Sequence, residues 1–222
     1  MLAPGHGGET DLGVKGPDGK LEKDVTLRLA ELIAAELEKS CNIILTRTED
    51  TELDIPARTA VANHFKADLF ISIHAGGGFV HKTRGISLCY FTDNYPEAAG
   101  TGIVQGKPVE NISLPVAWEK IQKKHELISS DFAIIVKKNL SGTIANDDIK
   151  IGGGNYAVLE GADMPAILIE TGYLTNPADE EAISGKEFPA GIVKGLSLAV
   201  DEYFQNIGLQ EKIKHGKPLA AK

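Results

Sequence analysis

Apolar and polar residues follow two patterns along this chain: short apolar runs, and longer stretches in which apolar residues recur at helical spacing. The apolar runs predict strands over residues 42–46, 68–75, 85–92, 155–161 and 165–172. Helical spacing predicts helices over residues 21–40, 55–65, 115–140, 176–184 and 188–204, the third with a break near residues 129–131. Strands that alternate with helices predict an α/β fold, a single domain whose mostly parallel, twisted sheet is flanked by helices.

The length of 222 residues is consistent with one domain, since domains commonly contain about 100–200 residues. We assign residues 1–206 to this domain and residues 207–222 to a frayed C-terminal tail. Within the domain, residues 93–149 form a longer insertion. Its first part, residues 93–114, is rich in Gly, Pro and Asn and is expected to be an irregular loop.

Composition narrows the classes of partner. The net charge of −8 argues against nucleic acid or anionic lipid as the main partner. No apolar run approaches the ~18 residues of a membrane span, and no signal peptide is recognisable, so the chain is either cytoplasmic or a trimmed part of an exported protein. Cys41 and Cys89 lie in apolar surroundings and are expected to be buried thiols; without a CxxC pair, a cysteine metal site is not expected.

Four residues with chemically versatile side chains stand at the ends or starts of predicted elements. His6 lies in "PGHGG", Glu22 begins the first helix, and His74 and Glu170 end apolar strands. Each has an ordinary structural interpretation: a strand-end histidine is often only hydrogen-bonded, and the helix dipole favours a glutamate in a first turn. Glu170 is the hardest to explain in this way, because a carboxylate after four apolar residues needs a partner when it is buried.

Taken together, the four residues indicate a metal hydrolase as an alternative to those separate interpretations. Two imidazoles and one carboxylate form a His₂Glu set, one of the open catalytic zinc arrangements. The neighbouring glycines, Gly5, Gly7, Gly8 and Gly76–Gly78, are expected to keep the open coordination position uncrowded. Glu170 would then accept a proton from the attacking water. Spacing along the chain does not show that the four residues converge.

At these residues the sequence resembles the zinc-dependent N-acetylmuramoyl-L-alanine amidases of bacterial cell walls. The resemblance runs from about Leu2 to Phe204 through several ordered motifs: "PGHGG", "LEKDVTLRLAELIAAEL", "LTRTEDTELDIPARTAVAN", "ADLFISIHA", "GISLCYF" and "MPAILIETGYLTNPADE". It implies one Zn²⁺ held by His6, Glu22 and His74, with Glu170 as general base. It also implies hydrolysis of the amide between N-acetylmuramic acid and L-alanine in peptidoglycan.

The resemblance has further implications for location and partners. It implies that the protein acts in the periplasm or outside the cell, after export by a segment that this chain does not contain. It is also compatible with a protein activator. Arg47, Arg58 and Asn63 match family positions too, and we interpret them as structural. Two other functions stay open: an amidase-like module that binds cell wall without turnover, and a zinc peptidase of other specificity, which the absence of a tight HxxE pair disfavours.

The sequence departs from the family pattern in three places. Ala3 stands where an aspartate is usual, and only three residues precede Pro4, so a full first strand is not expected. Gly76 replaces a common asparagine. The 93–149 segment is longer than in minimal members, and in some relatives such an insertion plugs the active site. Glu97, Glu110 or Glu119 would then fill the open position, although residues 114–133 look more like a packed helix.

Overall fold

The sheet has five strands, of which three of the four neighbouring pairs are parallel. The computed structural model describes residues 1–78, 81–93, 118–145 and 148–214. The order of the strands is β1-β2-β5-β3-β4, and only β3 and β5 are antiparallel. Their bounds are β1 Leu2–Pro4, β2 Phe70–Gly76, β3 Ile86–Phe91, β4 Ile149–Gly154 and β5 Ala166–Tyr173. The prediction of an α/β domain with a mostly parallel sheet is therefore confirmed.

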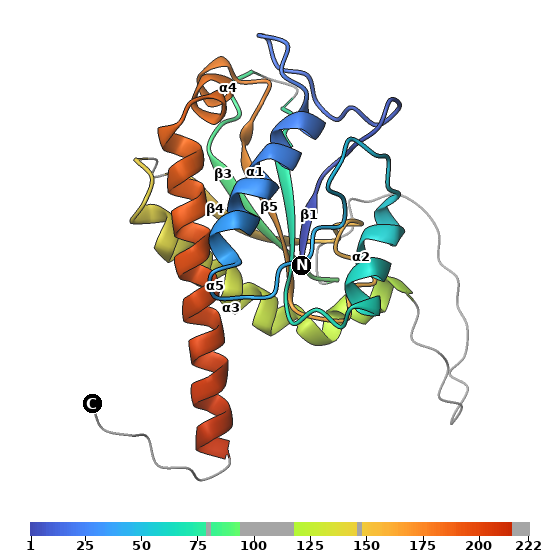
Figure 1. Ribbon diagram of the computed structural model, residues 1–222, viewed down its shortest axis with the longest axis vertical. Helices are drawn as coiled ribbons and strands as arrows, with labels where there is room; N and C mark the ends of the chain where they lie inside the picture. Colours follow the sequence, from blue (N-terminus) through green and yellow to red (C-terminus); the bar gives the residue numbers. More distant parts are fainter. Residues whose placement is uncertain (79–80, 94–117, 146–147, 215–222) are drawn as a thin grey trace.

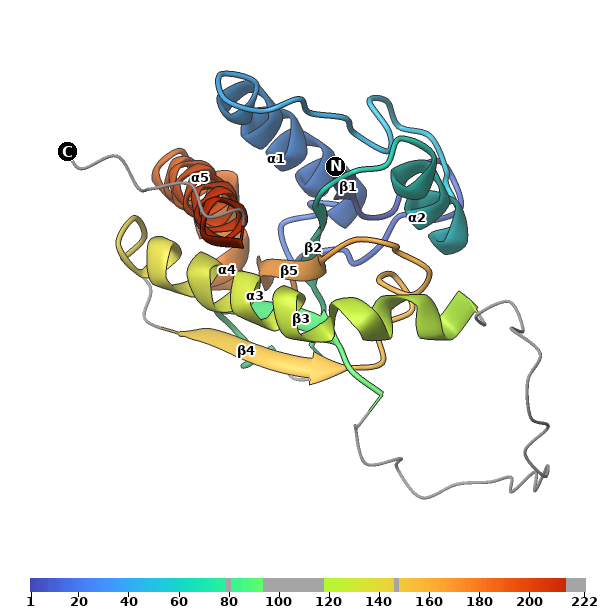
Figure 2. The ribbon, with the colours of Figure 1, turned by 90° about the horizontal axis from the view of Figure 1, so that it is seen from below.

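Helices cover both faces of the sheet (Figures 1 and 2). They are α1 Glu22–Leu37, α2 Ile55–His64, the 3₁₀ helix η1 Trp118–His125, α3 Glu126–Ser141, α4 Pro177–Ser184 and α5 Glu187–Lys214. α1, α3 and α5 pack on one face and form the larger core, whereas α2 packs on the other face with residues 155–164. No helix in the described part of the chain has the length and apolar character needed to cross a bilayer.

The alternation of side chains in β2 shows how the sheet separates core from site. Ile71 and Ile73 point to the larger core, and Phe70 lies in the smaller core on the opposite face. Because successive side chains of a strand point to opposite faces, His74 lies on the same face as Phe70. Ile167 and Ile169 of β5 repeat this pattern, so Glu170 also points away from the larger core. The face that carries α2 therefore also carries His74 and Glu170.

Two of the predicted strands do not form, and two strands of the sheet were not predicted. Leu2–Pro4 does form β1, paired in parallel with residues 71–73 of β2, so a short first strand is present. Residues 42–46 form only one bridge, between Leu45 and Leu2, and residues 155–161 form turns. β4 is not predicted by the apolar pattern, because half of Ile149–Gly154 is glycine.

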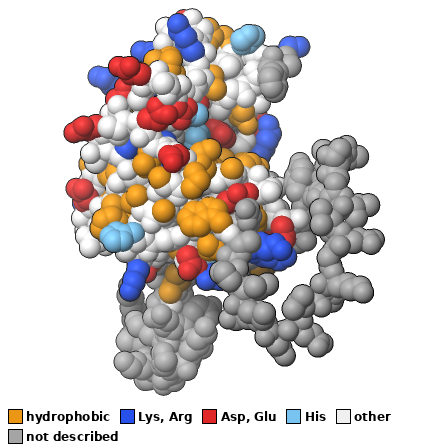
Figure 3. Space-filling model, turned by 90° about the vertical axis from the view of Figure 1, so that its right-hand side faces the viewer, with side chains coloured by type: hydrophobic (Ala, Val, Ile, Leu, Met, Phe, Trp, Pro, Cys, Tyr) orange, Lys and Arg blue, Asp and Glu red, His pale blue; other side chains and the backbone are white. Residues whose placement is uncertain are grey.

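In the segment 93–149, the helix predicted over residues 115–140 is formed over the described residues 118–141. The helical part changes from 3₁₀ to α geometry at Glu126, slightly before the predicted break, and α3 then covers β3 and β4. Residues 94–117, with Glu97 and Glu110, lie outside the described residues (grey in Figure 3), and of Glu119 only the backbone position in η1 is described. α5 continues to Lys214, well into the predicted tail.

Candidate metal and catalytic site

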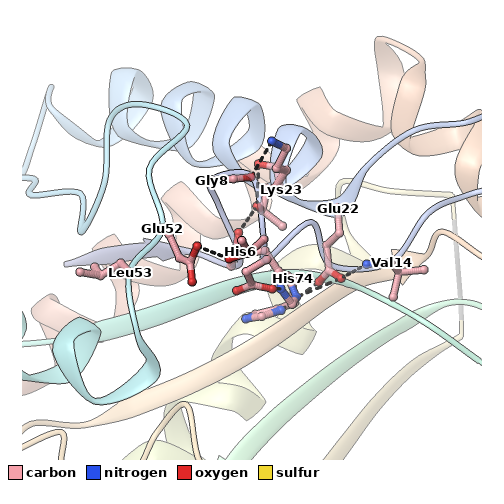
Figure 4. A network of polar contacts seen from close by, with 12 residues as sticks. His6, Gly8, Val14, Glu22, Lys23, Glu52, Leu53 and His74 are labelled. Atoms are coloured by element: carbon pink, nitrogen blue, oxygen red, sulfur yellow. Dashed lines mark hydrogen bonds and ion pairs between the residues drawn. The ribbon is translucent and has the colours of Figure 1, made fainter.

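Three side chains from different elements meet at the edge of the sheet where β1, β2 and β5 end (Figure 4). Nε2 of His6 lies 3.1 Å from Oε2 of Glu22, and Nδ1 of His74 lies 2.9 Å from Oε1 of the same carboxylate. One ligand atom from each of the three residues lies within 4.8 Å of the others. The structure thus brings together the residues that the sequence analysis selected as metal ligands.

The backbone around His6 is held in an unusual conformation by two buried arginines. His6 has a positive φ of 56°, which a non-glycine residue adopts only when its surroundings enforce it. Nη2 of Arg58 donates to the His6 carbonyl at 3.0 Å, and Nη1 donates to the carbonyl of Pro4. Nη2 of Arg47 donates to the carbonyl of Gly5 at 2.9 Å. Three successive carbonyls are therefore fixed, and with them the direction of the imidazole.

Arg47 also connects this segment to the start of α1. The same Nη2 that binds the Gly5 carbonyl donates to the carbonyl of Lys23 at 2.8 Å. Lys23 directly follows Glu22, and Arg47 is only 4% exposed. One guanidinium therefore joins the His6 segment to the Glu22 segment. Asn63, by contrast, bonds backbone groups of Gly161 and Asp163 at 2.7 and 2.8 Å, so these contacts agree with a structural interpretation.

Glu22 is almost fully buried and accepts two backbone hydrogen bonds as well as the histidine contacts. Its oxygens accept from the amides of Val14 at 3.0 Å and Ala75 at 3.1 Å. The preceding loop comes close: a Cβ at Gly13, whose φ is +66°, would lie 2.7 Å from Oε2 of Glu22. Glu180 of α4 anchors this loop by accepting from the amides of residues 18 and 20. A helix start on one side and a braced loop on the other therefore position the carboxylate.

Asp11 supplies a partner for His6 that the sequence analysis missed. Its Oδ1 lies 2.5 Å from Nδ1 of His6, and the Gly7 amide donates to the Asp11 carbonyl at 2.9 Å to close the loop between them. Ala3, where the family usually has aspartate, is fully buried in the smaller core. The absence of a carboxylate at Ala3 therefore does not leave His6 without one. The motif "HGGETD" does contain this carboxylate five residues after the histidine, but sequence alone does not show that the loop brings Asp11 back to His6.

Glu170 lies beside His74 in the sheet. The two residues are register partners in β2 and β5, so their side chains project from the same face about 5 Å apart at the backbone. Burial raises the pKa of Glu170 to about 7. Among the described residues, Oε2 of Glu170 and Nε2 of His74 are buried polar atoms without a hydrogen-bond partner. Such atoms are costly to leave unmatched, so the site is suited to a ligand that satisfies them.

The charges of the three clustered residues depend on one another. The hydrogen bond with Glu22 raises the pKa of His6 to about 9 against the effect of burial, and Asp11 adds to the increase. Burial alone would raise the pKa of Glu22, but hydrogen bonds with His6 and His74 outweigh it and hold this pKa well below its usual range. A carboxylate that stays ionised between two imidazoles is a donor set suited to a divalent cation.

The glycines of the two motifs make room mainly for protein atoms. A Cβ at Gly5 would lie 2.4 Å from the ring of His74, and one at Gly7 would lie 2.2 Å from the carbonyl of Thr51. At Gly76 a Cβ would lie 2.9 Å from the ring of Tyr173 and 3.1 Å from Oε2 of Glu170. These glycines therefore allow close contacts within the protein, at Gly5 and Gly76 with atoms of the site itself. That they also keep the open coordination position uncrowded stays a prediction.

Comparison with known proteins places these features in one family. The family model described as N-acetylmuramoyl-L-alanine amidase matches residues 1–202. The chain is 31% identical over 219 residues to the N-acetylmuramoyl-L-alanine amidase AmiC of Neisseria meningitidis, covering 91% of this chain and 52% of AmiC. It is 29% identical to AmiA of Salmonella typhimurium, covering 92% of this chain and 75% of AmiA. The chain thus spans about half the length of AmiC.

Solved structures show the same architecture. The crystal structure of an N-acetylmuramoyl-L-alanine amidase from Clostridium difficile 630 superposes with a TM-score of 0.73 and 26% identity, covering 92% of this chain and 95% of the other. The catalytic domain of the amidase CwlV from Bacillus (Paenibacillus) polymyxa gives a TM-score of 0.71 and 26% identity, covering 92% and 96%. Nearly the whole of each solved chain is therefore matched.

Proposed function

Because the chain belongs to the N-acetylmuramoyl-L-alanine amidase family, we propose that it hydrolyses the amide between N-acetylmuramic acid and L-alanine in peptidoglycan. The observation that carries this proposal is the convergence of His6, Glu22 and His74 within 4.8 Å beside the half-buried Glu170. We assign this activity to residues 1–206. Peptidoglycan lies outside the cytoplasmic membrane, so the proposal also places the working protein in the periplasm or outside the cell.

His6, Glu22 and His74 would hold a Zn²⁺ ion. Two imidazoles and a carboxylate that stays ionised fit this metal, and three protein ligands leave room for water or substrate. When bound, the metal supplies Lewis-acid chemistry, which polarises a carbonyl and makes a water molecule more acidic. The unpartnered polar atoms of His74 and Glu170 support the presence of a ligand at this place.

Glu170 is the proposed general base and acid. It would accept a proton from the water that attacks the lactyl carbonyl, and would then donate that proton to the nitrogen of L-alanine. Protonation of this nitrogen is needed because an amide anion is a poor leaving group. A carboxyl whose pKa is raised to about 7 by burial can take up and release a proton near neutral pH, which is what both steps require.

Digestion of purified peptidoglycan by the purified protein, followed by mass analysis, tests the reaction. We expect release of stem peptides that begin with a free L-alanine, loss of this release with a chelator, and recovery on addition of Zn²⁺. Intact glycan that retains its peptides, together with tight binding to the sacculus, would support a binding module instead. Cleavage within the stem peptide would support a peptidase of other specificity.

The Glu170→Gln variant separates catalysis from metal binding. It keeps the shape of the side chain and removes its acid–base chemistry, so we expect normal zinc content and a loss of turnover of at least about 100-fold. Glu181→Gln on α4 is a matched control at an exposed glutamate, and its turnover should equal that of wild type. Near-wild-type peptide release by Glu170→Gln would contradict the proposed mechanism.

A further inference from the structure

A row of four polar side chains crosses the sheet and continues beyond the proposed catalytic residues. His74 of β2 is the register partner of Glu170 in β5, and Glu170 is the partner of Ser87 in β3. Ser87 is in turn the partner of Lys150 in β4. Residues at matching positions on neighbouring strands point to the same face, so the row runs metal ligand, general base, hydroxyl and ammonium from β2 to the edge strand β4.

The part of this row beyond Glu170 is open. The side chain of Lys150 is 64% exposed. Two residues further along the same strand, a Cβ added at Gly152 would meet no heavy atom of the described residues within 4 Å. Ser87 is half-buried, and its hydroxyl lies 3.1 Å from that of Tyr173, whose ring packs against Gly76 beside Glu170. We refer to Ser87, Lys150 and Gly152 as the β3–β4 surface.

The chemistry of the proposed reaction indicates the direction in which the substrate peptide runs over this surface. His6, Glu22 and His74 lie on one side of Glu170, and the β3–β4 surface lies on the other. The scissile carbonyl must face the metal, and the nitrogen that leaves must face the group that protonates it. The peptide that follows this nitrogen therefore starts at Glu170 and extends away from His74. This inference rests on the proposed function.

We propose that the β3–β4 surface binds the stem peptide, and that Lys150 binds the free α-carboxylate of its second residue. In peptidoglycan this residue is D-glutamate, or the α-amide of D-glutamate. It is linked onward through its side-chain carboxyl, so its α-carboxyl is not part of the chain. Neighbouring strands are about 4.8 Å apart, so the backbone of Lys150 lies about 10 Å from that of Glu170. Two extended residues span about 7 Å, and the flexible lysine side chain covers the remaining distance.

Lys150 is free to make this contact. Its Nζ lies 3.2 Å from Oδ1 of Asp148, but an ion pair this exposed contributes little and exchanges readily with another carboxylate. An exposed ammonium on the same face of the sheet as Glu170 favours an anionic substrate group there. The missing side chain at Gly152 lets a peptide backbone lie close to the sheet.

Two synthetic substrates test the assignment: muramoyl-L-alanyl-D-glutamate with a free α-carboxylate, and the same compound with an α-amide. For Lys150→Gln we expect the KM for the carboxylate substrate to rise about tenfold with kcat nearly unchanged, and the amide substrate to be unaffected. Lys137→Gln, an exposed lysine on α3, is the matched control and should change neither substrate. Equal values for wild type and Lys150→Gln on both substrates would overturn the role of Lys150.

Gly152→Val tests the surface itself. The added side chain enters open space, so we expect an unchanged melting temperature and a KM that rises for both substrates. An unchanged KM would overturn the path of the peptide over β4. Binding of the product L-alanyl-D-glutamate, measured by calorimetry on wild type and Lys150→Gln, separates this proposal from the proposed function. Weaker binding by the variant supports the assignment even if neither substrate is hydrolysed, whereas equal binding contradicts it.

Discussion

Oδ1 of Asp11 lies 2.5 Å from Nδ1 of His6, and this contact leaves Nε2 of the same ring facing Glu22 at 3.1 Å. A carboxylate on the far nitrogen of a metal-binding imidazole fixes the ring and its tautomer, and makes the other nitrogen a better ligand. Ala3 cannot do this because it is a buried methyl group in the smaller core. The loop after the histidine motif thus provides a function that the first strand lacks.

Asp11→Asn should weaken metal binding without unfolding the protein. Loss of such a carboxylate typically costs about 10–100-fold in affinity, and we expect a change of that size in the zinc dissociation constant measured by competition with a chromogenic chelator. Asp131→Asn, at an exposed position on α3, should leave the constant unchanged. Equal affinity in Asp11→Asn and Asp131→Asn would show that His6 is oriented by its backbone alone.

Arg47→Lys should affect both stability and metal affinity. A lysine keeps the charge, but its single ammonium cannot bind the carbonyls of Gly5 and Lys23 in the geometry of the guanidinium. We expect the free energy of unfolding in urea to fall by about 2–4 kcal/mol and zinc affinity of the folded variant to fall as well. Arg28→Lys on the exposed side of α1 provides the comparison. If only stability changes, Arg47 supports the fold but does not set the distance between the two ligand segments.

Gly76→Ala should strain the wall of the site next to Glu170. The new methyl group would lie 2.9 Å from the ring of Tyr173, so one of them must move, at a cost of about 1–3 kcal/mol. We expect a lower melting temperature and a lower kcat, and we expect the two losses in Gly76→Ala and Tyr173→Ser to be less than additive when combined. At Gly142 the nearest atom to an added Cβ is 3.5 Å away, so Gly142→Ala should be close to neutral. Additive losses would mean that the two residues do not press on each other.

The metal-free protein should lose stability as the pH rises through the range in which Glu170 ionises. Its pKa is raised from 4.5 to about 7, so its contribution is fully present below pH 4.5 and is lost as the pH rises to about 7. A shift of this size corresponds to about 3 kcal/mol. Urea unfolding at pH 5.5 and pH 8 measures this loss. From the lower to the higher pH, the free energy of unfolding of Glu170→Gln should rise relative to that of wild type. Groups that do not interact with Glu170 titrate alike in both proteins and cancel in the comparison. Parallel pH curves would contradict the raised pKa of Glu170.

The elements that place the site could largely be predicted from the sequence. β2 and β5 are continuous apolar runs because helices or chain cover both of their faces, and such runs are conspicuous. His74 and Glu170 could be selected because a polar group directly after a buried run needs an explanation. The helix that begins at Glu22 likewise follows from its regular apolar spacing.

The remaining elements and contacts depend on tertiary structure. Residues 155–161 resemble a strand in sequence because they include the apolar Tyr156 and Leu159. Their backbone instead forms turns, and these two side chains pack in the smaller core. β4 is held by pairing with β3 and not by its own composition, which is half glycine. Asp11 and Arg47 act through loops whose paths no local pattern specifies, so their contacts with the His6 segment could not be inferred before the fold was known.

The direct pairing of β2 with β5 has a consequence for how this family can vary. Between the end of β2 at Gly76 and the start of β5 at Ala166 the chain forms β3 and β4, yet β2 and β5 lie side by side with His74 opposite Glu170. Of the elements between them, β3 and β4 pair only on the far side of β5, whereas residues 155–164 pack with α2 in the smaller core. Changes in β3 and β4 can therefore alter the surface that binds the substrate without altering the spacing of the reactive groups. Engineering of specificity should concentrate there and leave the β1–β2–β5 half intact.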